Sequence, residues 1–227
     1  APLERALADW RPEWLAAAGA VLRETDIFQP VDLTAPAQKH FAQAGINYQG
    51  ALVDYLENKA TALRRRYYLE AVADRGLRIF GDHDWGDPVH AGPLGACYAG
   101  RRLEYATELP ALYASAKINI NIFHAQCVTA PNPRVYDVLA AGGFLLTPAN
   151  PGLEEEFVDG RDLVVFRTRE ELRERVDYYL AHPRERREIA KNGRKHTLAS
   201  HGYHDRMQRF LYVSGRKSGE SHGYLCG

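Results

Sequence analysis

Residues 132–137, Asn-Pro-Arg-Val-Tyr-Asp, combine groups that could bind a phosphorylated ligand. Asn132 is a favoured N-cap, and Pro133 suits the first helical position because no N–H donor is needed there. Arg134 and Asp137 then share one face of the first helical turn. Free amides and an arginine attract phosphate, whereas a carboxylate accepts hydrogen bonds from hydroxyls. The segment therefore predicts a site for a nucleotide diphosphate and its ribose.

Two unusual loops flank this segment. Gly142 and Gly143 form a tight return into an apolar strand, and residues 148–152, Pro-Ala-Asn-Pro-Gly, follow that strand. A surface Arg–Asp pair on an ordinary capped helix is the alternative interpretation. Two such loops at one sheet edge are more than packing requires, so we expect ligand contacts here, including one from Asn150.

The segment 117–123 alternates isoleucine with asparagine, which predicts a strand with Asn119 and Asn121 on one face. Both asparagines are candidate ligand contacts, and exposed positions on a half-covered strand are the alternative. His124, at the strand end, could hydrogen-bond a phosphate or a sugar. It is the weak candidate for a catalytic base.

The loop 81–87, Gly-Asp-His-Asp-Trp-Gly-Asp, follows a short apolar segment. It is open to three interpretations: a polar loop without further role, a divalent-metal site, or a contact to nucleotide or sugar. The contact would come from Gly81, Asp82 and the stacking ring of Trp85. The calcium-loop pattern fails because its glycine and its final acid are misplaced. We favour the ligand contact over the metal and expect no metal or other cofactor.

The remaining charged residues and the cysteines suggest no site. The arginines at 64–66 and 182–194 interleave with glutamates, so we expect a solvated, salt-bridged face. The three cysteines lack metal-ligand spacing and suit a reducing, cytoplasmic setting.

The overall composition excludes several classes of function. The 227 residues carry 29 Lys+Arg and 29 Asp+Glu, whereas a nucleic-acid binder would show a basic excess. No apolar run reaches the roughly 18 residues of a membrane span, and the N-terminus lacks a secretory signal pattern.

The order of elements predicts an α/β protein. Residues 1–75 are expected to be helical apart from a connector at 26–37, residues 76–212 to form one domain, and residues 213–227 a flexible tail. Strands that alternate with helices indicate a Rossmann-like parallel sheet with helices on both faces. The expected strands are 77–80, 96–99, 117–123, 143–146 and 163–166. The expected helices of this domain are 107–116, 134–141, 153–157 and two within 168–212, the last ending near Gly193 or Ser200.

Several of these segments together resemble the carboxyl-terminal half of GT-B glycosyltransferases. The likeness is carried by 134–147, 153–157, 164–167 and 170–180 in this order, with 79–82 and 108–119 in support. It is closest to the bacterial CgeB-like (spore-maturation-type) group and covers roughly residues 60–210.

The resemblance implies a domain that binds a nucleotide-activated donor such as a UDP- or GDP-sugar. By that likeness Arg134 and the peptide groups at 133–135, including Val135, face the diphosphate. Asp137 takes the place of the second acid of the family's two-glutamate motif, which holds the ribose hydroxyls. Thr129 stands where that motif has its first acid.

The leading hypothesis is a glycosyltransferase, or its donor-binding domain, that transfers a glycosyl group to an unidentified acceptor. Residues 1–75 lack a strand–glycine–helix start and the chain begins at Ala1. This start suggests a fragment or a trimmed chain; if it is a fragment, an N-terminal Rossmann domain is a candidate for the missing part, and the chain would bind nucleotide without transferring a sugar. The alternative is a non-catalytic nucleotide-binding or protein-assembly module with a degenerate donor site.

Overall fold

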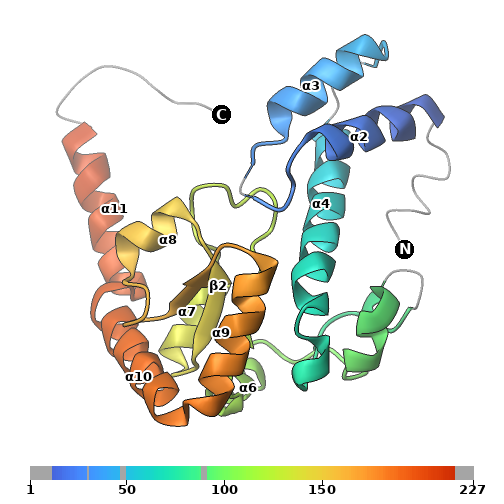
Figure 1. Ribbon diagram of the computed structural model, residues 1–227. Coiled ribbons are helices and arrows are strands. Elements are labelled where there is room, and N and C mark those ends of the chain that lie inside the picture. Colours follow the sequence, from blue (N-terminus) through green and yellow to red (C-terminus); the bar gives the residue numbers. More distant parts are fainter. Residues whose placement is uncertain (1–11, 30, 47–49, 88–90, 218–227) are drawn as a thin grey trace.

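A three-stranded parallel sheet in the order β1-β2-β3 lies at the centre of the computed structural model, which describes residues 12–29, 31–46, 50–87 and 91–217 (Figure 1). Asn119 pairs with Leu145, and Leu146 pairs with Val164. The parallel α/β architecture predicted from the sequence is thereby confirmed. The strands are β1 (Asn119–Ile120), β2 (Leu145–Pro148) and β3 (Val164–Phe166).

The two earlier strands predicted at 77–80 and 96–99 are reduced to one parallel bridge, between Ile79 and Tyr98, outside this sheet. Of the first segment only Ile79 is buried, and it packs in a small cluster with Leu94 and Cys97. Two short 3₁₀ helices, His83–Gly86 and Gly92–Cys97, lie between the two segments, which pair less extensively than the predicted strands would.

Helices cover both faces of the sheet. On one face, α7 and α8 pack against Leu145, Leu163 and Val165. On the other, α9 and the end of α4 pack against Leu146 and Phe166. The alternation of 117–123 explains this division, because its isoleucines pack with α4 and α9, while Asn119 donates to the carbonyl of Tyr113 and Asn121 to the residue before α7. These helices are α4 (Gly50–Glu70), α7 (Pro133–Ala140), α8 (Pro151–Glu156) and α9 (Arg169–Ala181).

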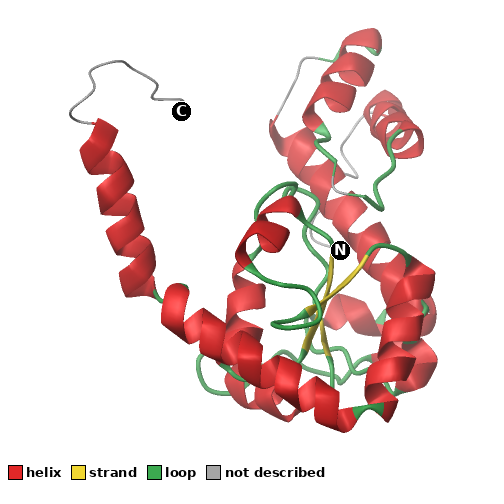
Figure 2. Cartoon of the chain, turned by 60° about the vertical axis from the view of Figure 1, so that its left-hand side comes forward, coloured by secondary structure: helices red, strands yellow, loops and turns green. Residues whose placement is uncertain are grey.

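The N-terminal helices α2 (Pro12–Glu24) and α3 (Thr34–Gln43) lie at the end of α4 that is farther from the sheet (Figures 1 and 2). Their common core surrounds Phe41 and Leu56. The expected connector at 26–37 is too long, because the Asp32 carboxylate accepts a 2.8 Å hydrogen bond from the amide of Thr34 and helix α3 begins there.

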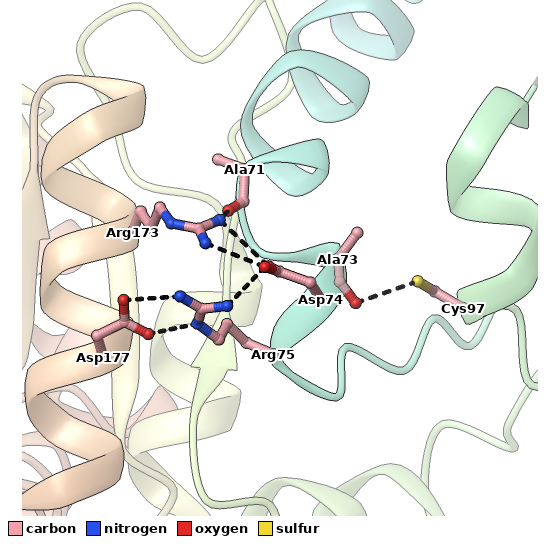
Figure 3. A network of polar contacts seen from close by, with 7 residues as sticks. All are labelled: Ala71, Ala73, Asp74, Arg75, Cys97, Arg173 and Asp177. Carbon is pink, nitrogen blue, oxygen red and sulfur yellow. Dashed lines mark hydrogen bonds and ion pairs between the residues drawn. The ribbon is translucent and has the colours of Figure 1, made fainter.

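A network of arginines and aspartates joins the end of α4 to α9 (Figure 3). Arg75 donates two hydrogen bonds to Asp177, of 2.5 and 3.1 Å. Arg173 of α9 donates to the carbonyl of Ala71 at 2.6 Å and to Asp74 at 3.0 and 3.2 Å. Single exposed ion pairs contribute little, but bidentate pairs in a network set the geometry of the elements that they join.

Helix α10 (Pro183–Ser200) begins and ends as predicted, at the later of the two expected ends. It continues through Gly193, where a Cβ atom would collide with the backbone of Asp162, so the glycine permits a close approach and does not end the helix. Helix α11 (Tyr203–Lys217) extends into the predicted tail, whose residues 218–227 lie outside the described ranges. Short α6 (Leu109–Ser115) matches the prediction at 107–116.

None of the helices in the described part of the chain combines the length and apolar character needed to cross a bilayer.

We predict that Gly193→Ala lowers the free energy of unfolding by about 1–3 kcal/mol, because the added methyl group overpacks the contact with Asp162. Urea denaturation provides the measurement. Gly19→Ala is the matched control, because the new methyl group meets only the flexible Arg23 side chain and gains helix propensity of about 0.5–1 kcal/mol. Equal effects at both positions would contradict the packing argument.

Candidate functional site

A pocket of about 610 Å³ opens where β1 ends and α7 begins, and its wall is formed by His124 and residues 126–133. Carboxyl ends of parallel strands are where α/β proteins bind ligands. The pocket thus lies beside the helix start that the sequence marked as the phosphate site. A neighbouring pocket of about 380 Å³ shares the wall residues 126, 128 and 129 and faces Asp32 and Glu57.

Two predicted contacts, Asn121 and Asn132, pair with each other beneath this pocket. Their amides exchange hydrogen bonds of 3.2 and 3.3 Å, and Asn121 also donates to Thr147. Asn132 occupies the N-cap position with extended backbone, but its side chain makes no capping bond. The structure therefore corrects the predicted cap: the amide group orders the loop before α7 and leaves the helix start without a side-chain cap.

The remaining asparagines support the backbone around the pocket. Asn119 and Asn121 share a face of β1 but are 9% and 0% exposed, so the alternative of exposed positions is wrong. Asn119 donates to the carbonyls of Tyr113 and Phe144. Asn150 is buried and donates to the carbonyls of Cys127 and Val128, while its oxygen caps α8. The Asn150 side chain thus supports the backbone of two residues in the pocket wall.

Arg134 and Asp137 are not paired with each other. Asp137 accepts a 2.8 Å hydrogen bond from the hydroxyl of Tyr105. Arg134 is exposed, and its guanidinium forms no hydrogen bond or ion pair with any residue that the structure describes. The side chain of Val135 is buried and its amide donates to the carbonyl of Asn132. The surface ion pair offered as an alternative does not form, and Arg134, the second residue of α7, keeps a charge that no described residue neutralises.

The arginine run 64–66 is not the solvated, salt-bridged face predicted from its interleaved charges. Arg64 is buried and donates to the carbonyls of Ile27 and Gln29. Arg65 is half-buried, and burial, together with the positive charge of Arg134, lowers its pKa. Only Arg66 behaves as predicted, in a surface pair with Glu70. Sequence reasoning missed Arg65 because the charges that it faces lie far along the chain.

His124 lies on the same side of the pocket as these arginines. Its Nε2 is 3.4 Å from the side-chain oxygen of Asn58, and its Nδ1 is buried with no hydrogen-bond partner among the residues that the structure describes. Burial lowers the pKa of His124, and the charges of Arg65 and Arg64 lower it further. The ring is therefore neutral at neutral pH, as a proton acceptor must be.

The loop 81–87 follows the end of α4 along the chain, and several of its side chains make contacts within the protein. Trp85 packs on Gly81 and against the cluster around Ile79. Asp82 is exposed and forms a 2.8 Å ion pair with Arg102, and its charge also acts on Arg65. In the described ranges no three His, Cys, Asp or Glu side chains gather closely enough to hold a metal ion.

Comparison with known proteins gives one match. The sequence model of a family described as glycosyl transferase-like matches residues 64–212, from the arginine run to helix α11. Neither the curated proteins nor the solved structures include a significant match to the chain. The matched range contains the larger pocket, Arg134, Asp137 and Arg65, and it agrees with the extent of the resemblance noted in the sequence.

We predict that His124→Gln makes stability less sensitive to acid. Because burial and the two arginines lower the pKa of His124 in the folded state, the unfolded chain takes up this proton first, near pH 6.5. The wild type therefore loses stability below about pH 6.5 that the variant keeps, by at most about 1.4 kcal/mol per pH unit. Urea denaturation between pH 5 and 8 measures the difference, and parallel pH profiles would contradict it.

Proposed function

The chain belongs to the glycosyl transferase-like family, and we propose that it binds a nucleotide-activated sugar and transfers the glycosyl group to an acceptor. The observation that carries this proposal is Arg134, whose guanidinium has no counter-ion among the described residues and which directly follows Pro133, the last residue of the pocket wall, at the start of α7. An arginine and helix dipole at one point attract a phosphate group.

The proposed role of Arg134 in transfer is electrostatic. When the bond between the sugar and the diphosphate breaks, negative charge develops on the leaving diphosphate. The guanidinium of Arg134 and the dipole of α7 would stabilise that charge without a metal ion. The electron pair leaves with the diphosphate oxygen, and a hydroxyl oxygen of the acceptor forms the new bond to the sugar while its proton passes to a base, for which neutral His124 is the weak candidate.

Asp137 is the proposed ribose contact. It lies one turn along α7 from Arg134, and Tyr105 donates to one of its carboxylate oxygens. A carboxylate has acceptor sites enough for this hydroxyl and for vicinal ribose hydroxyls. Tyr105 would thereby orient the carboxylate for the nucleoside.

The finer assignment is also a proposal: the donor-binding half of a GT-B enzyme of the CgeB-like group, with a UDP- or GDP-sugar as donor. The regions before residue 76 that the structure describes are helical, so the second Rossmann domain and the acceptor site would come from outside them. The neutral His124 remains the weak candidate for the base.

A second candidate is a nucleotide-binding module that transfers nothing. It is favoured by Thr129, which lines the pocket and offers a hydroxyl where the resemblance predicts an acid. Nucleotide binding without hydrolysis or transfer of any sugar would support this alternative.

We predict that UDP or GDP binds the purified chain and that Arg134→Ala weakens binding by about 1.5–3 kcal/mol, the scale of a charge-assisted hydrogen bond. Isothermal titration calorimetry measures both affinities. Arg175→Ala is the control, because that arginine forms a surface pair with Glu171 on α9. Absence of nucleotide binding at millimolar concentration, with the fold intact by circular dichroism, would sink the proposal.

A separate prediction concerns the ribose. Asp137→Ala should weaken UDP by roughly tenfold, since about 1.4 kcal/mol of hydrogen bonding is lost, yet leave inorganic pyrophosphate unchanged. The same calorimetric titrations with the two ligands provide the comparison. An equal loss for both would show that Asp137 acts on the phosphate site or on the fold.

A further inference from the structure

One face of α4 lies against the loop that leaves β1. Asn58 contacts the ring of His124 at 3.4 Å, and the hydroxyl of Thr61 accepts a 2.9 Å hydrogen bond from the amide of Ala125. Arg65 follows four residues after Thr61 and seven after Asn58, so the three side chains share this face. The helix thus directs Arg65 toward the carboxyl end of β1.

At that place the guanidinium of Arg65 lies near other positively charged groups. The charges of Arg65 and Arg134 repel each other, and His124 also feels the charge of Arg65. The guanidinium of Arg65 forms no hydrogen bond or ion pair with a described residue, and Asp82, the carboxylate whose charge raises the pKa of Arg65, is itself paired with Arg102. A half-buried cation beside another cation is costly unless an anion joins them.

We propose that Arg65 is a second phosphate ligand, and that the anion is a diphosphate bound between Arg65 of α4 and Arg134 of α7. This inference rests on the proposed function and deepens it. Each guanidinium can donate two parallel hydrogen bonds to one phosphoryl group. Two guanidiniums on separate helices suit two linked phosphoryl groups, so the site selects nucleoside diphosphates and their sugars over monophosphates.

The two arginines next to Arg65 in the sequence show which structural roles an arginine can take at this end of α4. Arg64 is a structural arginine, buried on two backbone carbonyls, and Arg66 is a surface arginine paired with Glu70. Arg65 has neither kind of partner. Its position therefore agrees with ligand binding better than with support of the fold.

Calorimetric titration of the full chain with inorganic pyrophosphate, UDP and UMP tests the proposal. Arg65→Gln should weaken pyrophosphate and UDP at least tenfold and UMP much less, whereas Arg66→Gln should leave all three unchanged. Arg65→Lys, which keeps the charge without the fork of donors, should recover part of the loss. Equal losses for UDP and UMP would overturn the preference for diphosphates.

Unfolding of the free protein separates a ligand contact from a structural role. Arg65→Gln should leave the urea midpoint unchanged or raised, since it removes charge repulsion, and pyrophosphate should stabilise the wild type more than the variant. A lowered midpoint together with unchanged UDP affinity would overturn the inference about Arg65. If UDP binding depends on Arg134 but not on Arg65, this inference fails and the proposed function stands. If no nucleotide binds the wild type, both fail.

Discussion

The position of helix α4 against the sheet is the constraint on which the candidate site depends. The end of α4 buries Tyr68 and Val72 with Phe166 of β3, and the arginine–aspartate network fixes it to α9. Because Arg65 lies on this helix, the packing of α4 against the sheet also determines the position of Arg65 relative to the start of α7. Apolar burial supplies most of the stabilisation, and the ion pairs fix the angle.

The charged groups near the pocket lower the stability of the protein when no ligand is bound. Arg65 and Arg134 repel each other, and burial disfavours both the Arg65 cation and protonated His124. A sheet with both faces covered and a fully satisfied asparagine pair beneath the pocket tolerate this cost. Such local conflict in a consistent fold is typical of sites that are shaped for a ligand.

Local rules predicted the local features of this chain. Pro133 begins α7, and the three central strands pair in parallel as the alternation of strands and helices indicates. The predictions fail where a tertiary contact, and not the local sequence, determines the conformation of a side chain. Asn132 has the side chain of a cap, but buried Asn121 offers it a partner with two hydrogen bonds.

The order of the chain has a consequence for how the protein forms. Arg75 and Asp177, which hold α4 to α9, are separated by 102 residues. During synthesis α4 leaves the ribosome long before α9 exists, so Arg75 and the apolar residues near the end of α4 wait without their native neighbours. Arg65 and Arg134 can take their final relative positions only after α9 has emerged, which makes completion of the proposed site a late event in biosynthesis.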